Sequence, residues 1–150
     1  MAIESSDAFL AFKNLLEVSN QLELAIDKGL SQDDLTAKQF KMMAVIDKAF
    51  DHAPSIKEVA AALGTSHQNI KQMADQLVGR GFLEIVRDQN DKRVLRLKTT
   101  EKNAQFWASR QREHEEFMVR LFSCLSSSEV RQLNRLLILL SDGITEYVEE

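Results

Sequence analysis

Apolar residues recur along most of the chain at the three-and-four spacing of amphipathic helices. The first such stretch covers residues 8–26, where Phe9, Phe12, Leu15 and Leu16 fall on one side of a helical wheel. Three pairs of residues have the spacing of capping boxes, in which side chain and backbone satisfy each other's unpaired groups. They are Thr36 with Gln39, Ser55 with Glu58, and Ser126 with Glu129. These patterns predict helices over residues 8–26, 36–50, 56–63, 66–80, 100–125 and from 126 onwards.

The 56–63 and 66–80 helices are joined by a very short turn. Gly64 ends the first helix, Ser66 is suited to cap the second, and Gly81 suits the left-handed residue that follows a helix end. This is helix-turn-helix spacing. After Gly81 the pattern changes to alternation, so residues 82–87 and 94–98 predict two strands and the polar segment 88–93 predicts their turn. The predicted fold class is mainly α with a small β-hairpin wing, a winged helix-turn-helix.

Acidic and basic residues are distributed unevenly along the chain. Its 150 residues carry a net charge of −4 at pH 7, which taken alone argues against a nucleic-acid partner. Residues 54–103 hold nine Lys or Arg and six Asp or Glu, whereas the remainder holds ten and seventeen. Positive charge is therefore concentrated on the predicted helix-turn-helix and wing, and a phosphate backbone meets this local charge.

The outward side of the 66–80 helix carries candidate DNA-reading residues. With Ile70 as the reference, Met73, Ala74, Leu77 and Val78 fall on the side expected to pack on the core. Amides suit adenine edges in the major groove, lysine suits phosphate or guanine, and a helix N-terminus favours phosphate. The predicted contacts here are Ser66, His67, Gln68, Asn69, Lys71, Gln72 and Gln76. In an isolated helix such amides would more often be solvated polar residues, but the capped turn before them and the basic hairpin after them favour DNA binding.

The predicted hairpin supplies a second group of candidates. Its cations are Arg87, Lys92, Arg93, Arg96 and Lys98. The tip, residues 90–93, is expected to place Arg93 in a narrow minor groove, with Asp91 holding the guanidinium through a charge-assisted hydrogen bond. We therefore add Arg87, Asp91, Lys92 and Arg93 to the predicted DNA contacts. The alternative is a solvated charged hairpin with no ligand.

Residues 35–100 resemble the MarR family of winged-helix regulators. The matching residues are Leu35-Thr36 before Gln39-Phe40, Glu58-Val59-Ala60, Leu77, Arg80-Gly81-Phe82-Leu83, Asp88, Asn90-Asp91-Lys92-Arg93 and Thr99-Thr100. The resemblance implies a homodimer in which residues 1–34 and 101–150 form a helical dimerisation region around the winged region 35–100. It also implies that the 66–80 helix reads the major groove of double-stranded DNA, that Arg93 approaches the minor groove, and that a small anionic, frequently aromatic, effector binds.

The chain departs from the pattern of that family at three positions. The family often has a basic residue where Gln72 stands, an arginine where Asn90 stands, and a glycine where Asn103 stands. Fewer cations mean fewer phosphate contacts, so we expect DNA affinity to depend more strongly on dimerisation and on low salt.

Other kinds of site find little support in the sequence. His52, His67 and His114 stand apart from one another and from Cys124, so neither a metal nor another cofactor is expected. Cys124 ends an apolar face and is interpreted as a small packing residue. No set of nucleophile and base, phosphate-binding glycine loop or carboxylate pair predicts an enzyme. Without a leader or a long apolar run, we expect a cytoplasmic chain with no membrane partner.

Two functional hypotheses follow from these patterns. The first is a sequence-specific, dimeric DNA-binding transcriptional regulator, a repressor of a pseudo-palindromic operator that a small-molecule effector relieves. The second is a winged-helix protein-interaction module without DNA readout, which the acidic net charge and the glutamine-rich helix motivate. The aromatic pairs Phe9/Phe12 and Phe106/Trp107 are interpreted as core or dimer-interface residues, and no residues are assigned to an effector pocket.

Overall fold

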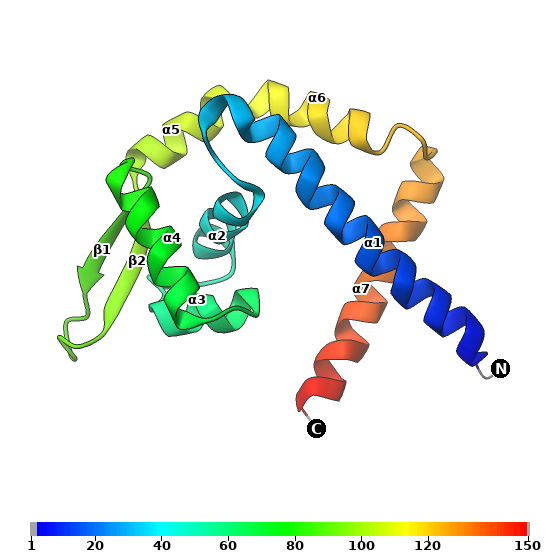
Figure 1. Cartoon of the computed structure of the whole chain (residues 1–150), viewed down its shortest axis with the longest axis horizontal. Coiled ribbons are helices and arrows are strands. Elements are labelled where there is room, and N and C mark those ends of the chain that lie inside the picture. The colour runs from blue at the N-terminus through cyan, green and yellow to red at the C-terminus, as the bar shows by residue number, and fades with distance from the viewer. Residues whose placement is uncertain (1–2, 150) are drawn as a thin grey trace. The chain divides into compact units, whose positions relative to one another are not determined.

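The computed structural model describes residues 3–149 and divides the chain into two compact units, Met1–Ala108 and Ser109–Glu150. The first unit contains most of the helices and both strands (Figure 1). Its elements are α1 (Ser5–Leu30), the 3-10 turn η1 (Ser31–Asp33), α2 (Ala37–Lys48), α3 (Ile56–Leu63), α4 (His67–Gly79), β1 (Leu83–Arg87) and β2 (Leu95–Thr99). Helix α5 (Glu101–Ser109) ends at the boundary, and the second unit contains α6 (Gln111–Leu121) and α7 (Ser127–Glu149).

Local capping explains where α2 and α3 begin. The Thr36 hydroxyl accepts a hydrogen bond from the Gln39 backbone N–H, and the Gln39 side chain accepts one from the Thr36 N–H, both at 3.1 Å. Ser55 and Glu58 form the same reciprocal pair at the start of α3. Both predicted capping boxes are confirmed, and each satisfies backbone donors that a helix start leaves unpaired.

The core of the first unit is formed where α2, α3, α4 and the hairpin meet. Its buried side chains are Leu35, Met42, Met43, Ile46, Ile56, Val59, Ala60, Ile70, Ala74, Leu77, Phe82, Leu83 and Leu97. Helix α4 contributes Ile70, Ala74 and Leu77, all fully buried, so one side of this helix is fixed against the core. Val78 was expected on that side but is 38% exposed, because the apolar stripe of α4 is narrower than the wheel suggested.

The two strands form an antiparallel hairpin in which Leu83 pairs with Thr99 and Arg87 pairs with Leu95. The backbone N–H of Leu97 also donates to the Pro54 carbonyl at 2.8 Å, and Ser55 bridges to Arg96. The segment before α3 therefore ties the hairpin to the helix-turn-helix. The predicted fold class, mainly α with a small hairpin wing, is confirmed.

Helix α5 is attached to the first unit by a buried polar residue and two aromatic rings. Asn103 is 2% exposed; its amide nitrogen donates to Asp47 at 3.4 Å and its amide oxygen accepts the Trp107 indole N–H at 3.0 Å. Trp107 contacts Phe40 edge-on, and Phe106 contacts Phe82 in the same way. The interpretation of Phe106 and Trp107 as core residues is thus confirmed.

One predicted helix is longer than its apolar stretch, ending just before the polar run that begins at Ser31, and another is interrupted. Helix α1 continues through Gly29 to Leu30, because the Arg80 guanidinium holds the turn beyond it by donating to the Asp33 and Asp34 carbonyls at 2.5 Å. The predicted 100–125 helix is interrupted at Arg110, whose ψ of 3° leaves the helical region. Residues 109–116 contain no apolar side chain, so no packing holds a continuous helix across this point.

The helices of the second unit bury few of their side chains within the single chain. Its capping box is confirmed, since the Ser126 N–H donates to Glu129 at 2.7 Å and the Glu129 N–H donates to Ser126 at 3.3 Å. No residue of α6 or α7 within the described part of this unit is buried. Cys124 is exposed in the turn after α6, so its interpretation as a packing residue is wrong for the single chain.

Candidate nucleic-acid interface

Helix α4 presents its polar side to solvent because its apolar side is fixed to the core. The Ser66 hydroxyl accepts a hydrogen bond from the Asn69 N–H at 3.1 Å, which starts the helix as predicted. All seven residues predicted on this helix, from Ser66 to Gln76, are exposed. The structure therefore brings these seven together on one helix and its N-terminus, where backbone N–H groups and the helix dipole favour an anion.

Two of the amide side chains on α4 have partners that fix their orientation. The Gln76 oxygen accepts a hydrogen bond from the Gln39 amide at 3.1 Å, and Gln39 is only 8% exposed. The Asn69 amide nitrogen donates to the Thr65 hydroxyl at 3.1 Å. These bonds link α4 to α2 and to the turn before α4. They reduce the number of orientations that the two amides can adopt.

The tip of the wing is organised by Asp88. One of its carboxylate oxygens accepts the backbone N–H groups of Asn90 and Asp91, at 3.0 and 2.9 Å. The backbone also closes on itself, since the Asp88 N–H donates to the Val94 carbonyl and the Val94 N–H donates to the Asp91 carbonyl. The side-chain bond from Arg96 and these backbone bonds hold the pKa of Asp88 below its usual value. Sequence reasoning missed this role, although an Asp two residues before Asn-Asp is a turn signal.

Asp91 restrains Arg93 from two sides. Its Oδ1 accepts the Arg93 backbone N–H at 3.0 Å and the Arg93 Nε–H at 3.1 Å, and its Oδ2 accepts Nη2 at 3.3 Å. The predicted charge-assisted bond is thus confirmed. Hydrogen bonding from the Arg93 side chain, then from its backbone, lowers the pKa of Asp91. The guanidinium still projects into solvent, because the Arg93 side chain is 91% exposed.

The other cations of the wing differ in the partners that they contact within the chain. Arg87 donates from Nη1 to the Lys92 carbonyl at 2.9 Å, while its own residue is exposed. Lys98 lies 3.7 Å from Glu84 across the hairpin. Arg96 was expected among the outward cations, and this is wrong: its guanidinium donates to Asp88 at 2.5 Å and to the Ala53 carbonyl at 2.9 Å. It therefore joins the wing to the start of α3.

A chain of polar contacts extends from Arg96 to the loop before α3. Glu58 lies 3.7 Å from Arg96, and its other oxygen contacts His52 at 2.8 Å. Bonds from the Ser55 backbone, from His52 and from the Ser55 hydroxyl lower the pKa of Glu58 to about 2. Asp51 and Glu58 together raise the pKa of His52. No local pattern predicts that Glu58 joins His52 to Arg96, because Arg96 is far from both residues along the chain.

A metal site and a membrane-spanning helix would each indicate a different function for the chain. No cluster of three or more His, Cys, Asp or Glu side chains suited to a metal ion occurs among residues 3–149. Over the same part of the chain, no helix is both long and apolar enough to cross a bilayer. The described polar surface of α4 and the wing is thus the most developed candidate site.

Comparison with known proteins agrees with this geometry. The model of the MarR family matches residues 33–94, which span α2, α3, α4 and the wing as far as the turn. The transcriptional repressor MprA of Escherichia coli strain K12 is 29% identical over 110 residues, which are 73% of this chain and 62% of that protein. The reduced form of MarR from E. coli superposes with a TM-score of 0.75 at 26% identity, covering 93% of this chain and 98% of the other. The part of the chain that holds the helix-turn-helix and the start of the wing is therefore similar to the MarR family.

Two further solved structures show how far the likeness extends. A mutant MarR from E. coli complexed with operator DNA has a TM-score of 0.74 at 26% identity, over 92% of this chain and 99% of the other. A MarR-like transcription regulator from Bacillus cereus ATCC 10987 has a TM-score of 0.75 at 19% identity, which shows a shared fold. The match to MprA spans about three fifths of that relative's length.

Proposed function

We propose that this chain is a sequence-specific, dimeric DNA-binding transcriptional regulator that acts as a repressor. The proposal rests on the presence of two features in the same region of the chain. One is the exposed polar face of α4, and the other is the Arg93 guanidinium, which Asp91 holds at the wing tip. The family supports it, since MprA is a transcriptional repressor and a MarR protein has been solved with operator DNA. The proposal assigns the chain no catalytic step.

Each part of the proposed interface has a distinct task on the duplex. Gln68 and Gln72 are suited to adenine edges in the major groove, and Lys71 to guanine or phosphate. Ser66 and His67, at the N-terminus of α4, are placed for a phosphate. Arg87, Lys92 and Arg93 would follow the adjacent backbone and minor groove, where a narrow groove attracts a guanidinium.

The apolar surfaces of α1 and α7 support the dimer. Helix α1 has no buried residue, and Phe9 and Phe12 are 68% and 59% exposed. Helix α7 exposes Leu136, Leu137, Leu140 and Ile144. Soluble monomers seldom leave apolar surfaces of this kind open to water. We therefore propose that residues 1–34 and 101–150 form the dimerisation region, and that the dimer reads half-sites about one helical turn, roughly 34 Å, apart.

Binding to DNA at two salt concentrations tests the proposal. The full chain is titrated with a fragment of its own promoter region and with a shuffled fragment of equal length. We expect a preference for the promoter of about a thousandfold or more, and an affinity that falls linearly with salt on logarithmic axes. Equal affinity for both fragments with no dependence on salt would contradict the proposal and favour a protein-interaction module.

A further inference from the structure

His52 contacts a carboxylate through each of its two ring nitrogens. Nδ1 lies 2.8 Å from an Asp51 oxygen, and Nε2 lies 2.8 Å from Oε1 of Glu58. An ionised carboxylate only accepts hydrogen bonds, whereas a neutral imidazole has a single N–H to donate. Both contacts are therefore satisfied together only when the ring carries two protons and a positive charge. Hydrogen bonds to Asp51 and then to Glu58 raise the pKa of His52, so the ring titrates above pH 6.5.

Glu58 connects His52 to the wing. Its other oxygen, Oε2, lies 3.7 Å from Nη1 of Arg96 on β2. The Nε–H of the same guanidinium donates to Oδ1 of Asp88 at 2.5 Å. The groups that face one another from the loop before α3, from α3 and from the hairpin thus form a row of charges of alternating sign, made up of Asp51, His52, Glu58, Arg96 and Asp88.

Loss of the His52 proton changes the balance of forces on Arg96. Glu58 then has one neighbouring cation instead of two, so its attraction for the guanidinium is no longer offset by a positive imidazole. The nitrogens of a guanidinium lie in one rigid plane, so a rotation that brings Nη1 toward Glu58 turns Nε away from Asp88. The side chains from His52 to Asp88 are 16–48% exposed, so water screens these charges and the proton alters an equilibrium of moderate size.

Asp88 transmits this change to the tip of the wing. Its Oδ2 accepts the backbone N–H groups of Asn90 and Asp91, and Asp91 holds Arg93 through three hydrogen bonds. A carboxylate that Arg96 has released can adopt more orientations, so the turn that it organises becomes less ordered. The order of the Arg93 guanidinium therefore depends on a proton held in the loop before α3.

We propose that His52 is a positioning residue for the wing, and that its positive charge makes the chain bind DNA more tightly. With the proton in place, Arg96 stays on Asp88 and the wing tip is ordered. Without it, Arg96 is drawn toward Glu58 and the tip loosens, so DNA affinity falls as the pH rises through the titration of His52. The effect on DNA affinity rests on the proposed function, whereas the coupling of His52 to the wing does not.

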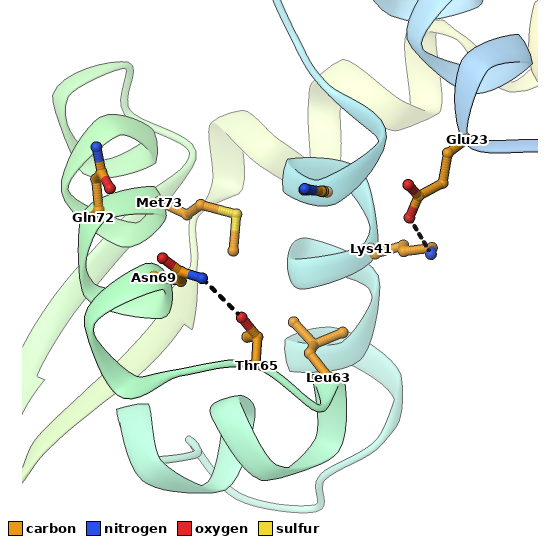
Figure 2. Close-up of a pocket in the computed structure, with 8 residues that line it drawn as sticks. Glu23, Lys41, Leu63, Thr65, Asn69, Gln72 and Met73 are labelled. Atoms are coloured by element: carbon orange, nitrogen blue, oxygen red, sulfur yellow. Dashed lines mark hydrogen bonds and ion pairs between the residues drawn. The ribbon is translucent and has the colours of Figure 1, made fainter. Parts of the chain in front are cut away.

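The coupling is tested without DNA, by two-dimensional NMR of the full chain between about pH 6 and pH 9 at constant ionic strength. The His52 imidazole gives its own titration curve, and we expect the backbone amides of Asn90 and Asp91 to shift with the same midpoint. The amides of Glu23 and Lys41, whose ion pair between α1 and α2 is drawn in Figure 2, are internal controls that should not follow it. Wing amides that do not share the midpoint of His52, or shifts of equal size at the two controls, would overturn the inference.

Two variants hold the wing in opposite states. His52→Gln places a neutral donor beside Glu58, so the wing amides should keep their parental high-pH positions at every pH. Glu58→Gln removes the carboxylate that competes for Arg96, so these amides should keep their parental low-pH positions. His67→Gln is the matched control, because His67 is an exposed histidine of α4 outside the row of charges, and the wing shifts should remain as in the parental chain. An unchanged wing titration in His52→Gln would refute the coupling.

DNA binding separates this inference from the proposed function. We expect the Kd of the parental chain for its promoter fragment to rise about threefold to tenfold from pH 6.5 to about pH 8.5, because two partly exposed rows each contribute a small factor. His67→Gln should keep most of this rise and His52→Gln should lose it. Promoter binding with the parental pH dependence in His52→Gln would sink the inference and leave the proposed function standing. Wing amides that follow His52 in a chain that binds no DNA would retain the coupling and contradict the regulator.

Discussion

Arg93 shows how a single exposed residue can be prepared for binding. Its side chain is 91% exposed, yet three hydrogen bonds from its backbone and guanidinium reach the same carboxylate of Asp91. A free arginine on a surface samples many rotamers, and ordering such a side chain on binding costs roughly 0.5–1.5 kcal/mol. Asp91 removes part of this cost in advance, and the hydrogen bonds from Arg93 that do so also lower the pKa of Asp91.

Replacing Arg93 by alanine should therefore weaken DNA binding and leave folding almost unchanged. We expect a loss of about 1–3 kcal/mol per copy in binding free energy, measured by titration with the promoter fragment. Lys48→Ala is the control, because Lys48 is an exposed cation of α2 outside both the proposed DNA contacts and the proposed dimerisation region. If Arg93→Ala lowered the melting temperature while Lys48→Ala did not, Arg93 would be structural instead.

For single residues, the sequence predicts contacts between neighbours along the chain well and contacts between distant residues badly. The bond between Asp91 and Arg93 joins residues two positions apart, so turn chemistry is enough to foresee it. Asn103 stands where the MarR family often has a glycine, and its buried bonds to Asp47 and Trp107 depend on how α2 and α5 pack. The same holds for Arg96, whose partners lie up to 43 residues away.

Among the elements, the start of α3 and the wing are joined electrostatically. Glu58 caps α3 at Ser55, contacts His52, and lies 3.7 Å from Arg96, which in turn binds the Asp88 that shapes the wing tip. Because these groups are partly exposed, each contact adds little stability alone. Their effect is to hold the hairpin and the helix-turn-helix in one arrangement.

Because Glu58 and His52 titrate, the stability of the folded chain should depend on pH through these contacts. The folded-state pKa of Glu58 is about 2 against an ordinary value of 4.5, so its charge stabilises the fold above pH 4.5 and is lost as pH falls toward 2. The pKa of His52 is raised above 6.5, so its contribution is complete below that value and is lost as pH rises through the raised pKa. The His52–Glu58 pair is therefore complete between pH 4.5 and 6.5.

Glu58→Gln removes the charge but keeps an oxygen that can cap α3. We expect the parental chain to melt at a higher temperature than this variant near pH 6, and the difference to shrink as the pH falls below 4.5. Circular dichroism melts at several pH values measure this. A constant difference across that range would show that the charge of Glu58 contributes nothing.

Helix starts and helix ends differ in how readily the sequence predicts them. The starts at Thr36, Ser55, Ser66 and Ser126 depend on side chains within one turn, and all four are confirmed. The end of α1 depends on Arg80, more than forty residues away, and the break at Arg110 depends on the absence of packing. Such ends are set by tertiary contacts that override local propensity.

For the whole molecule, the distribution of apolar surface is the dominant feature. The first unit has a continuous core beneath α4 and the hairpin, so the candidate DNA interface rests on a rigid support. The described helices α1, α6 and α7 contain no buried residue in the single chain. The chain thus has one well-packed region and long helix faces whose apolar side chains are exposed in the single chain. We propose that a second copy of the chain covers these faces.

Leu137→Glu should therefore produce monomers. Leu137 lies on the apolar side of α7 with Leu133, Leu140 and Ile144, and a carboxylate buried between two such helices would lose its hydration without gaining a partner. Sedimentation velocity should show a dimer for the parental chain and for the volume-conserving control Leu137→Met, and a monomer for Leu137→Glu. Since one copy can occupy only one half-site, the monomer should also lose most of its promoter affinity at physiological salt. An unchanged sedimentation coefficient for Leu137→Glu would show that α7 does not form the dimer interface.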